Sequence, residues 1–340
     1  MKVMILAAGF GTRLFPLTID RTKPAIPFLG RPLIRYVVEY VASFGFKEII
    51  INLHHQPQSI IDALGDGREM GVRIQYTLEE PNILGTAGAL DNARHLLGDE
   101  TFIVVNGKII TRINILEAIK RHRESGAIAT MVLRHNVKRE RFTEVYVENG
   151  FLKGFGDFAK PLTAEEIKDT TRDLSAPLMF TGIQVLEPRV FDYIPRGKYS
   201  DIVPTFYNPA LKRGELIAVH ITEELWYELS TIQRYLDVSL ELMEGGNVQV
   251  GRNCHISEFA SVRDTIIWDN VTIHQGAHLY RTVVADNVVI PEGEHFENAA
   301  IVRADMVRNC TEIPEKAPAG YIQGDNYIVP LIDYVDGFTK

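Results

Sequence analysis

A loop near the N-terminus combines glycines with fixed positive charges. In residues 6 to 24, LAAGFGTRLFPLTIDRTKP, Gly9 and Gly11 follow an apolar run, and Arg13 and Lys23 add two cations. Glycines let the backbone approach a phosphate closely and offer N–H donors to it, while arginine and lysine neutralise phosphoryl charge. The loop therefore predicts a site for a phosphorylated ligand rather than a tight turn with solvated cations.

This loop differs from the two standard phosphate-binding loops. Leu14 stands where a dinucleotide fingerprint has its third glycine, and the sequence contains no GK[ST] run.

A second candidate site lies at the end of FIVVNGKIIT, residues 102 to 111. Lys108 follows an apolar run with the character of a strand, and Ile109 stands where a phosphate loop would carry a hydroxyl for Mg²⁺. A lysine there could neutralise phosphate as a point charge. An isolated lysine is more often a salt-bridged surface residue, but a place at the site end of a strand favours the functional interpretation.

The elements that must position these residues follow from the hydrophobic pattern of residues 1 to 240. Apolar runs such as VMILAA, EIIINL and IATMVLR alternate with segments of helical period such as PLIRYVVEYVASFG. This alternation is typical of βαβ units and predicts an α/β fold with a Rossmann-like, doubly wound, mixed sheet. Ligands of such sheets bind beyond the carboxyl ends of the strands, so both candidate sites are expected at that edge.

After residue 246 the pattern becomes periodic. Apolar residues recur in three coils of 17 residues, at Val250, Ile256 and Val262, at Ile267, Ile273 and Leu279, and at Val284, Ile290 and Phe296. This is the hexapeptide pattern of a left-handed parallel β-helix. We therefore predict a first domain at 1–243, a β-helix domain at 246–305, and at 306–340 a C-terminal extension without a period. His255, His274, His278 and His295 are expected on turns or faces of the β-helix, because no partner motif accompanies them.

Composition limits the possible partners. A net charge of −8 and 46% hydrophobic residues indicate an ordinary globular protein and argue against nucleic acid as a partner. No apolar stretch approaches the length of a membrane span. Cys254 and Cys310 have no metal-ligand spacing, which favours a reducing, cytoplasmic location.

Beyond these patterns, residues 1 to 305 resemble the sugar-1-phosphate nucleotidyltransferases, in particular the mannose-1-phosphate guanylyltransferase-like branch with a C-terminal left-handed β-helix. The resemblance rests on LAAGFGTRL with TKP, on LGTAGAL at 84–90, and on FTGIQVLEP at 180–188. It implies that a sugar-1-phosphate oxygen attacks the α-phosphorus of a nucleoside triphosphate, that pyrophosphate leaves, and that a nucleotide sugar is formed. Such a transfer depends on positioning and charge neutralisation.

The resemblance also implies roles for individual residues. Arg13 would hold the departing pyrophosphate, Lys23 the α-phosphate, and Lys160, in FAKP, the sugar phosphate. The implied nucleotide-binding residues are Leu6, Ala8, Gly9, Gly11, Thr12, Gly85 and Thr86, and Gly88, Thr181 and Gly182 join Lys160 on the sugar-phosphate side.

The sequence departs from the family pattern where the family binds Mg²⁺. Members hold the ion with two aspartates, one in NGD and one in WxDIGTP, whereas this chain has Lys108 and Glu228 at those positions. Glu228 retains an oxygen ligand for a hard cation, so it is the candidate metal ligand and Lys108 joins the candidate catalytic residues. Further departures are Arg112, Asn114, Ala159, Ser230 and Ile232.

Three functional interpretations remain open at the level of sequence. In the first, the chain is a working nucleotidyltransferase in which Lys108 takes over part of the metal's task. In the second, it is a catalytically inactive homologue that binds nucleotide, nucleotide sugar or sugar phosphate in a regulatory role. In the third, the chain is a scaffold that uses only its β-helix. The flat coil faces predict a homo-oligomer. Branch resemblance suggests guanine, and the same loop in other branches suggests uracil or thymine.

Overall fold

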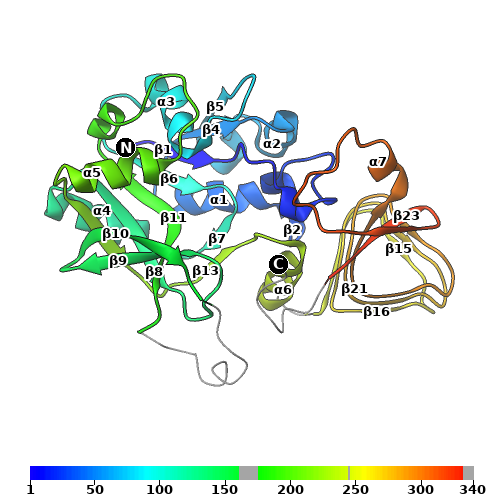
Figure 1. Ribbon diagram of the computed structural model, residues 1–340. Coiled ribbons are helices and arrows are strands. Elements are labelled where there is room, and N and C mark those ends of the chain that lie inside the picture. The colour runs from blue at the N-terminus through cyan, green and yellow to red at the C-terminus, as the bar shows by residue number, and fades with distance from the viewer. Residues whose placement is uncertain (161–174, 244–245, 332–340) are drawn as a thin grey trace.

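The computed structural model describes residues 1–160, 175–243 and 246–331, which form an α/β part and a β-helix lying side by side (Figure 1). The α/β part is built on a nine-stranded mixed sheet in the order β5-β4-β1-β6-β11-β8-β12-β10-β9. Its strands are β1 (Val3–Leu6), β4 (Glu48–Leu53), β5 (Arg73–Leu78), β6 (Phe102–Asn106), β8 (Ala129–His135), β9 (Thr143–Glu148), β10 (Phe151–Phe158), β11 (Leu178–Leu186) and β12 (Ile217–Ile221).

The strand directions create a crevice beside β1. Strands β5, β4, β1 and β6 are parallel, whereas β11 runs antiparallel to both β6 and β8. The chain passes from β1 to β4 on one side and returns to β6 on the other. The carboxyl ends of β1 and β6 therefore border the point where the strand order reverses, which is where such sheets bind ligands. The expected doubly wound mixed sheet is confirmed.

Helices cover both faces of the sheet because its central strands are apolar on both sides. Val3 and Ile5 of β1 pack in one core cluster with helices α1, α2 and α4, and Met4 packs in the opposite cluster with α3 and α5. The helices are α1 (Leu33–Ser43), α2 (Pro57–Leu64), α3 (Gly85–Leu97), α4 (Ile115–Ser125), α5 (Asn208–Lys212) and α6 (Ile232–Leu242). Two short strands, β7 (Ile109–Thr111) and β13 (Trp226–Glu228), form a separate antiparallel pair below the crevice.

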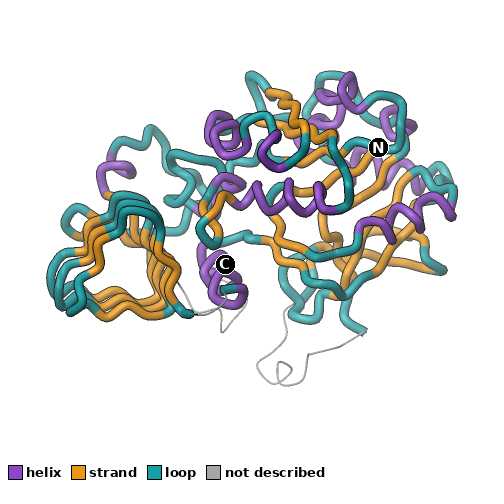
Figure 2. The backbone as a smooth tube through the Cα atoms, turned by 180° about the vertical axis from the view of Figure 1, so that it is seen from behind, coloured by secondary structure: helices purple, strands orange, loops and turns teal. Residues whose placement is uncertain are grey.

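The periodic segment forms stacked coils with the period read from the sequence (Figure 2). Ile256 pairs with Ile273 and Ile273 with Ile290, each step being 17 residues. The coils consist of β14 (Val248–Val250), β15 (His255–Ile256), β16 (Ser261–Arg263), β17 (Thr265–Ile267), β18 (Thr272–Ile273), β19 (His278–Val284), β20 (Val289–Ile290) and β21 (His295–Arg303). The four histidines expected on turns or faces are all exposed.

The segment after the coils continues the same sheet. Helix α7 (Ala304–Arg308) is followed by β22 (Tyr321–Gln323) and β23 (Asn326–Pro330), and β23 pairs antiparallel with β21. The sequence indicated no repeat in this region, and the structure contains none there, but the hairpin was missed. Residues 332–340 lie outside the described part of the chain.

A shared hydrophobic cluster joins the two parts. It contains Leu14, Phe15 and Leu17 from the N-terminal loop together with Trp268 and Val283 from the β-helix. The domain limits at 243 and 246 remain a prediction, since residues 244–245 lie outside the described part. Within the described residues, no helix has the length and apolar character needed to cross a membrane.

Candidate active site

A cavity of about 570 Å³ opens at the carboxyl ends of β1 and β6. It brings together ten of the residues selected from the sequence, namely Leu6, Ala8, Gly9, Gly11, Thr12, Arg13, Lys23, Gly85, Thr86 and Lys108. These come from four separate segments of the chain. The expectation that both candidate sites meet at one sheet edge is therefore met.

The two loop glycines have different tasks. Gly11 has φ +67°, and a Cβ atom there would lie 2.8 Å from Cβ of Lys23. This glycine lets the start of the loop pass close to the lysine that ends it. A Cβ atom on Gly9 would meet nothing within 4 Å, so Gly9 leaves open space on the cavity wall.

A buried polar relay fixes the cavity wall, and sequence reasoning missed it. Oδ1 of Asn52 accepts a hydrogen bond from the Ala7 amide at 2.8 Å, and its Nδ2 donates to Glu79 at 2.6 Å. The other oxygen of Glu79 accepts from the Leu84 amide at 2.6 Å. The loop after β1 is thereby tied to the start of α3. A polar residue ending an apolar strand, as in EIIINL, was the available signal.

The first turn of α3 contributes another part of the wall. Oδ1 of Asp201 accepts hydrogen bonds from the amide and hydroxyl of Thr86, at 3.2 and 3.3 Å, and its Oδ2 accepts from the exposed Tyr199 at 3.0 Å. Both Asp201 and Tyr199 line the cavity. A Cβ atom on Gly85 would lie 2.7 Å from the Ser200 carbonyl, and one on Gly88 would lie 2.6 Å from that of Lys198. Gly88 does not line the cavity, and its close contact supports packing of α3.

Lys23 is the most unusual charge in the site. It is only 7% exposed. Burial lowers the pKa of its ammonium to about 7, assisted by Lys108 and Arg13 and opposed by Glu228. Throughout the described part of the chain, no hydrogen bond or ion pair within 4 Å reaches this ammonium. A buried cation without a direct partner beside a cavity is suited to an anionic ligand, because the ligand would restore the charged form.

Lys108 is held by Glu228, which lies 120 residues later in the chain. Its Nζ donates to Oε1 at 2.7 Å, and the ladder between β7 and β13 places Glu228 opposite Ile109. Burial alone would raise the pKa of Glu228, but the positive charges of Lys108, Lys23 and Arg13 outweigh burial and lower the pKa. Glu228 is therefore an ionised partner of the cations and does not line the cavity itself.

These residues do not fit a protein-bound Mg²⁺ ion. The position of the two family aspartates holds an ammonium and a carboxylate that are already paired. The described residues contain no group of three or more histidine, cysteine or carboxylate side chains that could hold a metal. Mg²⁺ requires several oxygen ligands in nearly octahedral geometry, and an adjacent ammonium repels it. The structure thus disfavours Glu228 as a metal ligand.

The residues expected on the sugar-phosphate side lie outside the cavity lining. Thr181 is buried, and its hydroxyl donates to the Val132 carbonyl at 2.8 Å. Gly182, with φ +80°, leaves room for Asn106, because a Cβ atom there would lie 2.1 Å from the Asn106 amide nitrogen. Asn106 does line the cavity and was missed. Lys160 is exposed and directly precedes residues 161–174, which are outside the described chain.

Two of the departures from the family pattern have structural roles. Asn114 caps α4 by accepting a hydrogen bond from the Leu116 amide at 3.2 Å. Ala159 is buried, and its amide donates to the Phe142 carbonyl at 2.9 Å. Ser230, by contrast, lines the cavity.

Comparison with known proteins agrees with this geometry. A family model described as nucleotidyl transferase matches residues 2–245, and a GlmU-like C-terminal hexapeptide model matches residues 242–310. A solved structure of a putative glucose-1-phosphate thymidylyltransferase from Bacillus anthracis has a TM-score of 0.59 and 23% identity, over 72% of this chain and 97% of that one. This likeness shows the fold.

Curated relatives carry the family assignment further. A UTP–glucose-1-phosphate uridylyltransferase of Synechocystis is 31% identical over 80% of this chain and 72% of its own length. An N-acetylmuramate alpha-1-phosphate uridylyltransferase of Neisseria meningitidis is 32% identical over 69% of this chain and 95% of its own. A mannose-1-phosphate guanylyltransferase of Mycobacterium tuberculosis is 24% identical over 81% and 82%. With residues 2–245 matched by the family model and two relatives 31% and 32% identical, the chain belongs to the nucleotidyl transferase family and carries a left-handed hexapeptide β-helix.

Proposed function

We propose that this protein joins a nucleoside triphosphate to a sugar-1-phosphate, forming a nucleoside-diphosphate sugar and pyrophosphate, and that it does so with a cationic site. The observation that carries the proposal is the cavity in which the glycine loop, Arg13, Lys23 and Lys108 meet. Three cations line it, and so do two carboxylates, Glu79 and Asp201. Both carboxylates already accept hydrogen bonds from the cavity wall. Lys23 and Lys108 keep donor positions for phosphate oxygens.

The chemistry requires positioning and charge neutralisation. A phosphate oxygen of the sugar-1-phosphate forms a bond to the α-phosphorus, and the bond from that phosphorus to the pyrophosphate oxygen breaks. Negative charge increases on the departing oxygen, so fixed cations lower the barrier. In this scheme Lys23 holds the α-phosphate, Arg13 holds the pyrophosphate, and Lys108 neutralises charge at the position where the family pattern has a metal-binding aspartate.

The Lys108–Glu228 pair supports transfer without a protein-bound metal. A pair at 2.7 Å keeps the ammonium fixed at the cavity, while the remaining donor positions of Nζ stay available. The comparisons do not favour the alternative of a catalytically inactive homologue, since the family and the relatives are transferases. Two of these relatives are uridylyltransferases and one is a guanylyltransferase, so UTP and GTP are the first nucleotides to test.

The test is release of pyrophosphate from UTP and GTP with glucose-, N-acetylmuramate- and mannose-1-phosphate, in Mg²⁺ and in EDTA. We expect turnover with at least one pair of substrates, a residual rate in EDTA, and a fall of about 100-fold in Lys108→Ala. A matched control is Lys153→Ala, which removes the lysine of an exposed pair at 2.9 Å between Lys153 of β10 and Glu148 of β9. This control should leave the rate unchanged.

Two results would overturn the proposal. Nucleotide binding without pyrophosphate release under any pairing would show a binding protein. Equal rates in Lys108→Ala and the wild type would show that Lys108 has no part in the transfer.

We further propose that the chain forms a homo-oligomer through its β-helix. Its first coil exposes Val250, Ile256 and Phe259, the last being 71% exposed. Phe259 stands one coil before Gly276 and two before Gly293, so a large apolar side chain occupies a turn position that is otherwise glycine. A cytoplasmic location is part of the proposal and is supported by two free thiols, Cys254 and Cys310.

A further inference from the structure

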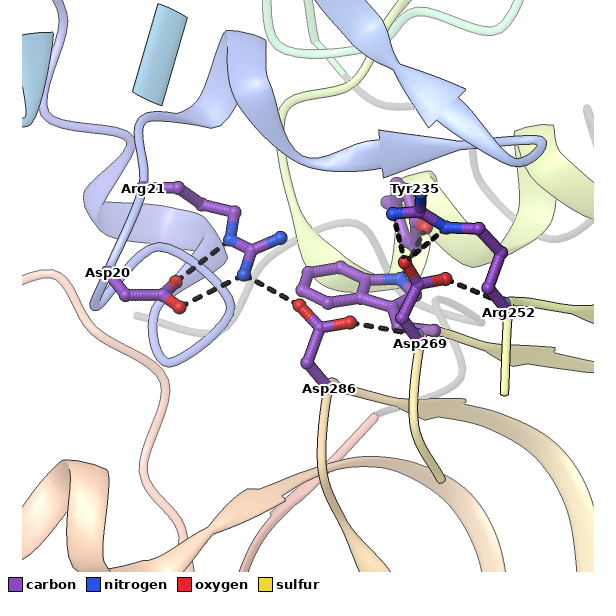
Figure 3. A network of polar contacts seen from close by, with 7 residues as sticks. Asp20, Arg21, Tyr235, Arg252, Asp269 and Asp286 are labelled. Atoms are coloured by element: carbon purple, nitrogen blue, oxygen red, sulfur yellow. Dashed lines mark hydrogen bonds and ion pairs between the residues drawn. The ribbon is translucent and has the colours of Figure 1, made fainter. Parts of the chain in front are cut away.

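The loop of residues 6 to 24, the nucleotide loop, is anchored to the β-helix through Arg21. This arginine lies two residues before Lys23 (Figure 3). The Arg21 guanidinium donates to Asp20 at 2.9 and 3.0 Å and to Asp286 at 2.6 Å. Its central carbon also lies 5.2 Å from the centre of the Trp268 ring. Asp20 belongs to the loop, whereas Asp286 and Trp268 belong to the β-helix.

The β-helix residues that contact Arg21 are themselves held by hydrogen bonds. Oδ1 of Asp286 accepts the Asp269 amide at 2.8 Å, one coil earlier, which leaves Oδ2 for Arg21. The Trp268 indole is 3% exposed and donates to the hydroxyl of Tyr235 in α6 at 3.0 Å. Tyr235 in turn donates to the Pro27 carbonyl, just after the loop, at 2.5 Å. The β-helix therefore contacts the loop directly and is connected to the segment that follows it through Tyr235 of α6.

We infer that Arg21 is a positioning residue, through which Asp286 and Trp268 of the β-helix hold the nucleotide loop so that Lys23 points into the cavity. The inference rests on the proposed function, because it assigns to the β-helix a part in the same phosphate site. Lys23 would remain the group that touches substrate, and Arg21 would act through it.

Arg21 and Lys23 are separated by only one residue along the chain. Two residues span at most about 7 Å, so a displacement of Arg21 is transmitted directly to Lys23. The backbone between them is constrained, since the Thr22 amide donates to Oγ of Ser59 at 3.1 Å and the Ala25 amide to the Thr22 carbonyl at 2.9 Å. Earlier in the loop, Leu14 packs in the same cluster as Trp268.

Burial strengthens the anchoring pair. The side chains of Arg21 and Asp286 are 21% and 19% exposed, so water screens their attraction less than it screens a surface pair. A neighbouring pair offers the contrast. Arg252 and Asp269 lie one coil away and are also 2.6 Å apart. Arg252 is 86% exposed, however, and within the described part of the chain it has no recorded hydrogen bond or ion pair to the loop.

The experiment compares Asp286→Asn and Asp286→Glu with the matched control Arg252→Ala, in the full-length protein. Steady-state rates are measured while each substrate is varied in turn. This distinguishes effects on the use of nucleotide from effects on the use of sugar phosphate. We expect Asp286→Asn to lower kcat/KM for the nucleotide by about 10- to 100-fold, since a displacement of about 1 Å can have such effects. The KM for sugar-1-phosphate should stay within about twofold, because the anchor acts on the loop that holds the nucleotide.

The other variants separate positioning from stability. Asp286→Glu keeps the carboxylate and should recover part of the loss, and Arg252→Ala should match the wild type in rate. Equal rates in Asp286→Asn and the wild type would overturn the inference, as would an equal loss in Arg252→Ala. If Asp286→Asn does not fold, Arg21→Lys, which keeps the charge and loses the forked contact, replaces it under the same criteria.

A second readout keeps the inference separate from the proposed function. If the wild type shows no turnover, the proposed function fails, and titration with UTP and GTP in a calorimeter then tests the anchor by affinity. Weaker nucleotide binding in Asp286→Asn than in Arg252→Ala would support the inference. Equal affinities would refute it.

Discussion

Replacing Lys108 with methionine removes the cation that faces the buried carboxylate of Glu228, while most of the side-chain volume is kept. Two unit charges about 4 Å apart attract by about 4 kcal/mol at an effective dielectric constant of about 20. Lys108 is 35% exposed, so roughly half of this value is lost to screening. Glu228 is only 9% exposed in its side chain and stays in place without its direct partner. We expect the free energy of unfolding to fall by about 2 kcal/mol.

The assay is thermal and urea unfolding of Lys108→Met, Glu228→Gln and the double variant. A loss of about 2 kcal/mol corresponds to a fall of about 4–8 °C in the melting temperature of the α/β part. The double variant removes both charges and should be more stable than Lys108→Met, with a coupling energy of about 1–2 kcal/mol. Lys153→Met, in the exposed pair with Glu148, is the control and should change stability by less than about 0.5 kcal/mol.

The pH dependence has a definite sign. The pKa of Glu228 is lowered in the folded protein. Its contribution to stability is therefore fully present above the unfolded value of about 4.3 and is lost as the pH falls through the folded value. In Lys108→Met the attraction from Lys108 is gone while the burial of Glu228 remains, so the pKa of Glu228 should be higher than in the wild type. The loss of stability should therefore begin at a higher pH. A Lys108→Met protein as stable as the wild type, with no coupling in the cycle, would refute the view that this pair is a stabilising unit.

Three further predictions concern the loop and the β-helix. Because the pKa of Lys23 is lowered to about 7, nucleotide binding at pH 8 should take up about one proton and at pH 6 close to none, and calorimetry in buffers of different ionisation enthalpy measures this uptake. Gly11→Ala should lower the free energy of unfolding by about 1–2 kcal/mol, because Gly11 has a positive φ and lies against Lys23; urea unfolding measures this loss. Gly9→Ala should leave stability unchanged and weaken nucleotide binding, which titration measures. Phe259→Asp should raise the monomer fraction in sedimentation velocity, and an unchanged distribution would exclude the first coil as the contact.

Local sequence patterns predicted a large part of the fold. The 17-residue period predicted the coils and their register, because each coil buries the same positions on its neighbours. Alternating apolar runs and helical segments predicted the doubly wound sheet, and the rule that ligands bind at carboxyl strand ends predicted that Lys108 joins the glycine loop. The hairpin of β22 and β23 was missed because a single pair of short strands repeats nothing.

Long-range contacts were decided by the tertiary structure. The sequence identified Lys108 as misplaced for a metal site, but its ion pair with Glu228 depends on the ladder between β7 and β13. Thr181 matched a family strand, yet its hydroxyl is bonded to Val132 across the sheet. The sequence by itself determined which residue types gather at the phosphate site, since glycines, cations and hydrophobic periodicity act over a few residues. Only the tertiary structure decided which charges face one another, because Arg21 and Asp286 lie 265 residues apart and meet only when two separately formed parts pack together.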